Sequence, residues 1–242
     1  MDFKDFDRRQ YRTVSVLDGY GEWAATYEQT VPDQLDIRVL ESLKTLNLQL
    51  RRTCLDLACG TGRIGAWLKS KGVSNIDGLD ITPEMLDRAR AKGIYKNLFH
   101  GSIEASGLAG GGYDLLVMSL VDEHLPSLGP VYREAHRLGA PGGTMVVVGM
   151  HPFFFMQGMP THFKDAEGHP KAIETHVHLT SEHVNAAFEA GWSLREMYEG
   201  AIDDEWLRVK PKWAALKGYP VNFGYVWKRG SRDPRPEGSG EG

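Results

Sequence analysis

The sequence predicts an α/β fold built on a doubly wound parallel sheet. Apolar runs of strand length alternate with segments of helical periodicity between about residues 53 and 149, the order typical of strand–helix–strand crossovers. The run over residues 144–149 is almost entirely β-branched and apolar, as expected of a strand covered on both faces. A glycine-containing loop joins the first of these strands to the following helix, so we expect a ligand there, at the carboxyl ends of the strands.

Composition narrows the class of protein. Of the 242 residues, 41% are hydrophobic and 25% charged, which is ordinary for a globular chain with a large core. We expect a single domain over residues 1–229, and the net charge of −4 gives no reason to expect a nucleic-acid partner. No apolar run approaches 18 residues and the N-terminus lacks a signal-peptide core, so we expect no membrane association. With only two cysteines, Cys54 and Cys59, a reducing cytoplasm is the simplest compartment.

The region up to residue 149 supplies the parallel part of the predicted sheet. Pro32 begins a helix that continues to about Leu48, with apolar residues at helical spacing. Thr82, followed by Pro83, is a typical helix N-cap. The predicted strands are residues 53–58, 75–80, 95–100, 113–119 and 144–149, and the predicted helices between them are residues 62–71, 82–91 and 127–138.

The two ends of the chain are less regular. Residues 1 to about 18 are polar and expected to be mobile until something covers them. Residues 20–27 predict a short amphipathic helix whose Trp23 and Tyr27 either cover a ligand or pack on the core. An aperiodic, aromatic-rich stretch predicts a loop insertion over about residues 150–173. The remaining predicted elements are strands at 173–179, 192–199 and 220–227 and helices at 180–191 and 204–216, the last interrupted by Pro211. Residues 230–242 have the composition of a disordered tail.

Residues 55–65, Leu-Asp-Leu-Ala-Cys-Gly-Thr-Gly-Arg-Ile-Gly, form the most informative stretch. Gly60 and Gly62 lack Cβ atoms, so backbone N–H groups can approach a ligand closely. The stretch is not a dinucleotide-binding motif, because Ala58 occupies the position of that motif's first glycine. It is not a P-loop either, because no Gly-Lys-Ser/Thr follows. Asp56 places a negative charge where a pyrophosphate does not fit, and a ligand with an ammonium group suits it. Asp80 follows at the spacing from which an acid accepts from both ribose hydroxyls.

These residues resemble motif I of the class I S-adenosylmethionine-dependent methyltransferases, whose usual form is D-L-G-C-G-T-G. Residues 75–86 are similar to the second strand with its acidic end, residues 113–119 to the fourth strand, and residues 134–143 to the E-x-x-R-x-L-x-P-G-G turn, from which Gly139 and Ala140 depart mildly. Four ordered motifs over about 100 residues make the resemblance specific. The methyl group of Ala58 affects only the close packing around the loop.

The resemblance implies a Rossmann-like, seven-stranded sheet of order 3-2-1-4-5-7-6 with an antiparallel last strand, and an N-terminal lid over about residues 1–31. It also implies S-adenosyl-L-methionine as the cofactor. Ile81 would then pack on adenine, Ser102 would replace the carboxylate that usually accepts from the adenine amine, and Ser119 and Leu120 would offer carbonyls to the methionine ammonium. The cofactor-binding residues expected on this basis are Asp56, Ala58, Cys59, Gly60, Gly62, Asp80, Ile81, Ser102, Ile103, Ser119 and Leu120.

Methyl transfer requires alignment of nucleophile, methyl group and sulfur, and a base where the nucleophile carries a proton. By resemblance to phosphoethanolamine methyltransferases, His124 is the candidate base, with Tyr20 or Tyr27 as its partner; His124 could equally be a structural histidine. The candidate acceptor-binding residues are His151, Phe154, His176 and His178. His176 and His178 would share one face of a strand, where they would line the pocket or bond to one another.

Several alternatives remain open. Glu123-His124 resembles part of the E-x-x-E-H segment of metal-assisted O-methyltransferases, but Leu120 stands where that segment has its first glutamate, so we expect no metal. An RNA or protein methyltransferase would usually show a basic face or an added binding module. A non-catalytic cofactor-binding protein is the third alternative. The leading prediction is an enzyme that methylates an O or N atom of a small, partly apolar metabolite, with its acceptor and its oligomeric state left open.

Overall fold

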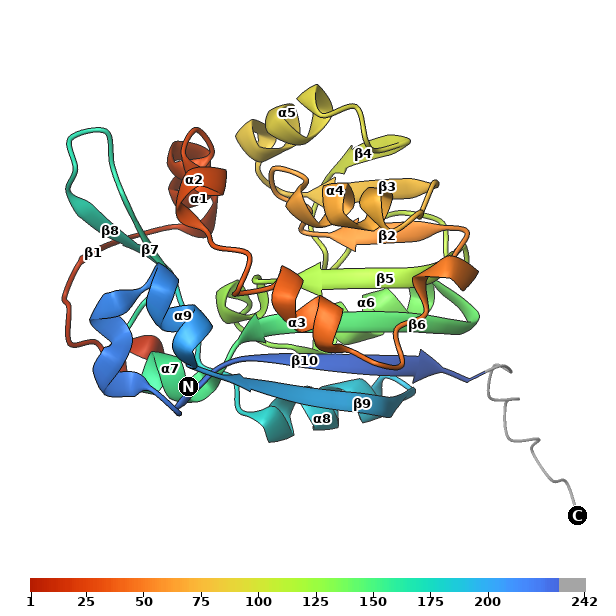
Figure 1. The fold of residues 1–242 in the computed structure, drawn as a ribbon. Coiled ribbons are helices and arrows are strands. Elements are labelled where there is room, and N and C mark those ends of the chain that lie inside the picture. The colour runs from red at the N-terminus through yellow and green to blue at the C-terminus, as the bar shows by residue number, and fades with distance from the viewer. Residues whose placement is uncertain (231–242) are drawn as a thin grey trace, which may run out of the picture.

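The computed structural model describes residues 1–230, and its main feature is a seven-stranded sheet (Figure 1). In spatial order the strands are β4 (Asn97–His100), β3 (Ile76–Asp80), β2 (Cys54–Leu57), β5 (Tyr113–Ser119), β6 (Gly139–Met150), β10 (Pro220–Arg229) and β9 (Trp192–Ala201). The pairs from β4 to β6 are parallel, and β10 is antiparallel to both of its neighbours. The predicted fold class and strand order, 3-2-1-4-5-7-6, are therefore confirmed.

Helices cover both faces of this sheet. Helices α3 (Ile37–Ser42) and α4 (Arg63–Ser70) pack on one face, and α6 (Gly129–Leu138) and α8 (Thr180–Glu189) on the other (Figure 1). Apolar strand residues contribute to both cores because successive side chains point to opposite faces: Leu116 belongs to the α6–α8 side, and Leu115 and Val117 belong to the α3–α4 side. Helix α5 (Pro83–Ala91) follows β3 and contacts both β3 and β4.

A smaller structure lies beyond the carboxyl ends of the parallel strands (Figure 1). It contains a second sheet of order β1-β8-β7, formed by Arg12–Val14, Pro170–Ile173 and His162–Lys164, in which β1 runs parallel to β8. The helices of this region are α1 (Val16–Trp23), α2 (Tyr27–Thr30), α7 (Pro152–Met156) and α9 (Asp204–Val209), and the 3-10 turns at Phe3–Asp5 and Pro211–Leu216 complete it. Residues far apart in the sequence thus enclose one end of the sheet.

Other parts of the chain cover the polar segment over residues 1–18. The terminal ammonium of Met1 donates to the carbonyl of Val177 at 2.9 Å, and Phe3 is buried against Phe155 and Val177. Strand β1 is hydrogen-bonded to β8, about 160 residues away in the sequence. These contacts give the polar N-terminal segment the partners that its own sequence does not reveal.

Three predicted elements also differ in extent. The helix predicted over 32–48 is reduced to α3, because Asp36 caps its N-terminus and Leu43 leaves it in an extended conformation; the turn at Leu48–Leu50 is separate. The aperiodic insertion contains α7 and the hairpin β7–β8 rather than loop alone. The strand predicted over 173–179 is wrong, because β8 ends at Ile173 and only His176 makes an isolated bridge, to Asp2.

Two further points concern the ends of the chain and the membrane. The tail predicted as disordered over 230–242 lies, apart from Gly230, outside the described residues. Within residues 1–230, no helix has both the length and the apolar character that a bilayer crossing requires.

Candidate functional site

The loop after β2 adopts the left-handed backbone that its glycines favour. Ala58, Gly60 and Gly62 have φ angles of 55°, 52° and 86°, so the alanine that departs from the family pattern sits in a conformation costing about 1–2 kcal/mol for a residue with a Cβ atom. The departure therefore affects backbone strain rather than packing. A Cβ atom on Gly60 would meet nothing within 4 Å, whereas one on Gly62 would lie 3.0 Å from the ring of Tyr95. The missing side chain of Gly60 therefore leaves open space beside the loop, whereas that of Gly62 allows the Tyr95 ring to pack against the backbone.

Asp80 fixes this loop from the end of β3. Its Oδ2 accepts from the amide of Gly60 at 2.7 Å, and its Oδ1 accepts from the amide of Thr82 at 2.8 Å. Burial raises the pKa of the Asp80 carboxyl despite these bonds. The carboxylate thus has lone pairs directed at two ordered amides and further acceptor capacity toward a ligand.

Asp56 lies behind the loop and not in the cavity beside it. The Tyr95 hydroxyl donates to its Oδ2 at 2.7 Å, and burial raises its pKa to about 7. The expectation that Asp56 faces a ligand ammonium is therefore not supported by its position. It holds β2, α4 and Tyr95 together instead.

A small cavity of about 60 Å³ lies against the loop. It has room for about two waters, and α1 contributes part of its wall. Of the expected cofactor-binding residues, the cavity is lined by Ala58, Gly60, Asp80, Ile81, Ser119 and Leu120. Its further lining residues are Val16, Tyr20, Tyr27, Thr82, Met85 and Val121, among which Val16, Thr82, Met85 and Val121 were not predicted. Thr82 and Met85 follow Asp80 within five residues, so their nearness to the predicted cofactor site could have been inferred from the sequence.

The other expected cofactor-binding residues do not line this cavity. The Cys59 side chain is buried close to Gly78, and Gly62 is in contact with Tyr95. The hydroxyl of Ser102 accepts from the amide of Glu104 at 3.1 Å, and Ile103 belongs to the core on the α6–α8 side of the sheet. The structure gives these four residues local packing or turn-forming roles.

A second, larger cavity of about 900 Å³ lies on the other side of Tyr20, Tyr27 and Leu120, which line both cavities. Its walls come from α1 and α2, from the insertion after β6, and from the 3-10 turn that follows α9. Phe154, a candidate acceptor-binding residue, lines it, and so do Lys210, Lys212 and Trp213, which were not predicted. We call it the chamber. It brings together aromatic residues from three parts of the chain: Tyr11, Tyr20, Trp23, Tyr27, Phe154, Phe163 and Trp213.

Tyr20 and His124 are hydrogen-bonded where the two cavities meet. His124 Nδ1 lies 2.6 Å from the carbonyl oxygen of Glu174; since a carbonyl only accepts, Nδ1 carries the proton. Nε2 is then free to accept from the Tyr20 hydroxyl at 2.8 Å. Burial raises the pKa of Tyr20 well above its usual value, so the phenol stays protonated. His124 itself does not line the chamber and reaches it through Tyr20. Tyr27, the other expected partner, contacts the rings of Tyr20 and Trp23.

Glu123 is a further acidic group of the chamber wall. Its Oε1 accepts from the Thr161 hydroxyl at 3.1 Å and lies 3.8 Å from His124 Nε2. Its Oε2 is buried with no hydrogen-bond partner among the described residues, and burial raises the pKa of the carboxyl. From the sequence, Glu123 was a candidate to take the proton of the acceptor as well as a possible metal ligand.

The three histidines expected to bind the acceptor are directed elsewhere. His151 caps α7 and lies 3.1 Å from Glu199. His178 is buried, with Nε2 2.7 Å from the carbonyl oxygen of Leu125. His176 is half-buried, and its ring centroid is 6.3 Å from that of His178, so the two do not bond to one another. None of the three is among the residues that line the two cavities.

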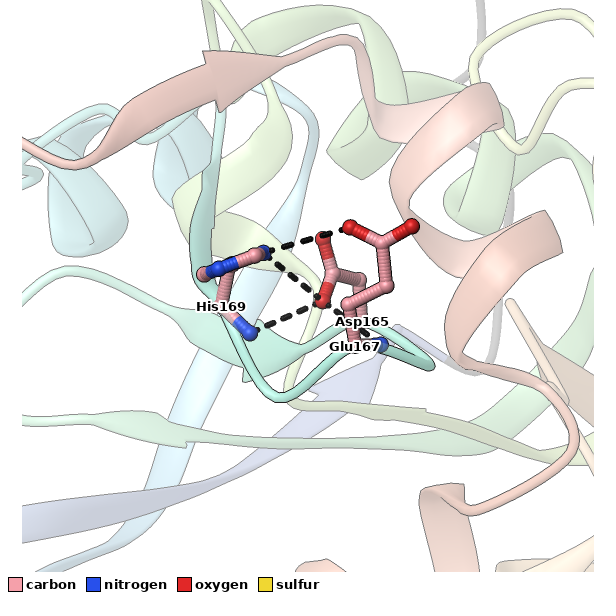
Figure 2. A group of neighbouring side chains, drawn as sticks. All are labelled: Asp165, Glu167 and His169. Atoms are coloured by element: carbon pink, nitrogen blue, oxygen red, sulfur yellow. Dashed lines mark hydrogen bonds and ion pairs between the residues drawn. The ribbon is translucent and has the colours of Figure 1, made fainter.

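These positions also bear on the metal-assisted alternative. No third histidine or carboxylate joins Glu123 and His124 as a ligand set within residues 1–230. The group that the described residues do form is Asp165, Glu167 and His169, at the turn between β7 and β8 (Figure 2). Asp165 Oδ1 there accepts from the amides of Glu167 and His169, and its Oδ2 is 3.4 Å from Lys171 Nζ. Those bonds explain the cluster as part of the hairpin turn.

Part of the chain is similar to known methyltransferases. Residues 55–147 match a family model described as a methyltransferase domain. The chain is 34% identical to methyltransferase-like protein 27 of Homo sapiens over 84 residues, 33% of this chain and 34% of that protein. It is 30% identical to malonyl-[acyl-carrier protein] O-methyltransferase of Legionella pneumophila over 150 residues, 59% of this chain and 52% of that protein. The chain thus spans about a third to a half of the length of these relatives.

Solved structures share the fold. An S-adenosylmethionine-dependent methyltransferase from Mesorhizobium loti aligns with a TM-score of 0.60 and 23% identity over 88% of this chain and all of that chain. A complex of DhpI with SAH aligns with a TM-score of 0.63 and 19% identity over 89% of this chain and 96% of that chain. At these identities the likeness shows the common architecture.

Proposed function

We propose that the chain is a class I S-adenosylmethionine-dependent methyltransferase and that it transfers a methyl group from S-adenosyl-L-methionine to an oxygen or nitrogen atom of a small, partly apolar metabolite; its residues 55–147 match the methyltransferase-domain model. The observation that carries this proposal is the meeting of the two cavities. Tyr20, Tyr27 and Leu120 line both, so a cofactor held at the glycine loop would have the chamber, and an acceptor in it, directly beside it. The aromatic wall of the chamber suits an acceptor with an apolar part.

The residues around the small cavity fit the cofactor that the family uses. The absent Cβ of Gly60 leaves open space, Asp80 has acceptor capacity for ribose hydroxyls, and Ser119 and Leu120 end β5 beside it. The φ of Leu120 is 54°, a left-handed conformation that redirects the backbone at the strand end. When bound, the cofactor supplies an electrophilic methyl group on a sulfonium.

The chain's own contribution to the reaction is a route for the acceptor proton. The Tyr20 oxygen takes the proton of the bound acceptor while its own phenolic proton passes to His124 Nε2, 2.8 Å away. His124 then carries protons on both nitrogens, and the Glu174 carbonyl keeps the ring oriented. The burial that keeps Tyr20 protonated makes the phenol a relay rather than a base in its own right.

The proposal is tested by a screen of small acceptors for release of S-adenosylhomocysteine. Acceptors with a ring or alkyl body and a hydroxyl or amine are expected to give turnover that requires S-adenosyl-L-methionine. The Gly60→Trp variant, which fills the space beside the loop, provides the control for uncatalysed release. A protein that does not bind S-adenosyl-L-methionine in isothermal titration would contradict the proposal.

Cofactor entry is expected to require movement of the N-terminal segment. The small cavity has room for about two waters, far less than a nucleoside needs, and α1 forms part of its wall through Val16 and Tyr20. We therefore expect S-adenosylhomocysteine to change hydrogen exchange in residues 16–30 and 150–164, with slower exchange once the segment closes over the ligand. The amides of β5 provide the internal reference. Equal exchange in these segments with and without the ligand would argue against a lid.

A further inference from the structure

Glu123 gives the chamber a buried carboxyl group that pairs with no lysine or arginine among the described residues. Its side chain is 3% exposed, and its one ion-pair neighbour among the described residues is His124 at 3.8 Å. His124 uses Nε2 in its hydrogen bond with the Tyr20 hydroxyl and Nδ1 in its hydrogen bond with the Glu174 carbonyl, so neither ring nitrogen is hydrogen-bonded to Glu123. The lysines of the chamber wall, at positions 164, 210 and 212, form no ion pair or hydrogen bond with Glu123. An unpaired buried carboxylate is costly unless a ligand supplies the opposite charge.

Several aromatic side chains line the same chamber as Glu123. The Tyr20 ring lies 5.2 Å from that of His124, 5.8 Å from Trp23 and 6.0 Å from Tyr27. The Trp23 ring is 5.6 Å from that of Phe163. All four aromatic residues line the chamber together with Glu123. Aromatic faces attract cations, and the combination of aromatic rings with one carboxylate is typical of sites for alkylammonium groups.

We infer that the group of the acceptor that enters this end of the chamber is an amine, bound as an ammonium ion with Glu123 as its counter-ion and with the rings of Tyr20, Trp23, Tyr27 and Phe163 around it. This inference rests on the proposed methyltransferase function and selects nitrogen over oxygen as the methylated atom. A hydroxyl acceptor would leave the second carboxylate oxygen of Glu123 without the charge that offsets its burial. In the absence of a cation, burial favours the protonated carboxyl.

The proton and electron balance follows from the same contacts. The bound ammonium gives one N–H proton to the Tyr20 oxygen as the phenolic proton moves to His124 Nε2, which leaves a neutral amine with a lone pair. The nitrogen lone pair forms the new N–C bond while the S–C bond of the cofactor breaks with its electron pair left on sulfur. The product is an N-methylated ammonium, and the proton on His124 returns to solvent. Glu123 holds the nitrogen before and after the transfer.

The test compares matched amines and alcohols. Benzylamine, 2-phenylethylamine and tryptamine are each titrated against the alcohol of the same skeleton, by isothermal titration at saturating S-adenosylhomocysteine. With the wild type, at least one amine is expected to bind about tenfold or more tightly than its alcohol. Glu123→Gln, which keeps the shape and removes the charge, is expected to reduce that preference by about 10- to 100-fold.

Asp122 provides a matched control for the charge change. It is also buried with an unpartnered oxygen, but it lies 3.3 Å from His183 and lines neither cavity. Asp122→Asn removes a charge that raises the pKa of Glu123, so it is expected to keep the amine preference or to strengthen it, and thermal unfolding checks that both variants are folded. A wild type that binds S-adenosylhomocysteine but binds no amine more tightly than its alcohol would overturn the inference and leave the proposed function in place. Failure of the wild type to bind S-adenosylhomocysteine would overturn both.

Discussion

Replacement of His124 by alanine is expected to lower kcat by about 10²- to 10⁴-fold, the usual size of the loss of a general base. His124 Nε2 is the end of the proton route that begins at the Tyr20 hydroxyl, 2.8 Å away. Without the imidazole the buried phenol has no base beside it, and its raised pKa prevents it from accepting the proton alone. The loss is therefore expected in kcat, with the affinity for S-adenosylhomocysteine unchanged.

Tyr20→Phe separates this route from a structural role of the imidazole. The phenylalanine ring keeps the aromatic contacts and removes only the hydroxyl that links His124 to the chamber. We expect a loss of kcat similar to that of His124→Ala, and a double variant no worse than either single variant, because both changes interrupt one path. Full kcat in His124→Ala would show that alignment alone suffices. A loss restored by a divalent metal, or chelator-sensitive activity of the wild type, would favour the metal-assisted alternative.

Asp80→Ala is expected to weaken S-adenosyl-L-methionine binding by about 1.5–3 kcal/mol, or about 10- to 150-fold in Kd, the size of lost charge-assisted hydrogen bonds. Two effects act in the same direction. The variant removes the carboxylate that would accept from the ribose, and it releases the amides of Gly60 and Thr82 that Asp80 holds at 2.7 and 2.8 Å. The backbone of the glycine loop is then no longer held in the conformation that leaves space for the cofactor.

Asp80→Asn distinguishes these two effects. Its amide oxygen still accepts from one of the two backbone amides, so the loop keeps part of its anchor while the negative charge is lost. Isothermal titration with S-adenosyl-L-methionine is expected to rank the affinities as wild type, Asp80→Asn and Asp80→Ala, from tightest to weakest. An unchanged Kd in Asp80→Ala would remove Asp80 from the cofactor site.

Local features of this protein could be predicted from the sequence because each depends on residues that are close along the chain. The order of apolar runs and helical segments predicted the parallel sheet. The glycine spacing predicted the loop after β2, and Asp80 was predicted at the end of the next strand; the structure places both against the small cavity. The interruption at Pro211 was likewise predictable, since proline lacks the N–H that a continuous helix needs, and α9 ends just before it.

The chamber could not be predicted from the sequence, because it is formed by contacts between residues far apart along the chain and no local pattern encodes such contacts. Tyr20 and His124 are 104 residues apart, and β1 meets β8 across most of the chain. His178 is turned toward the carbonyl of Leu125, 53 residues away. Its residue type alone suggested that it binds the acceptor, and its position does not support that role. The sequence by itself determined the sheet, the glycine loop and the acid at the end of β3, because backbone propensity and side-chain period act locally. Only the tertiary structure decided which side chains face the chamber, because a buried polar group turns toward whichever distant partner satisfies it.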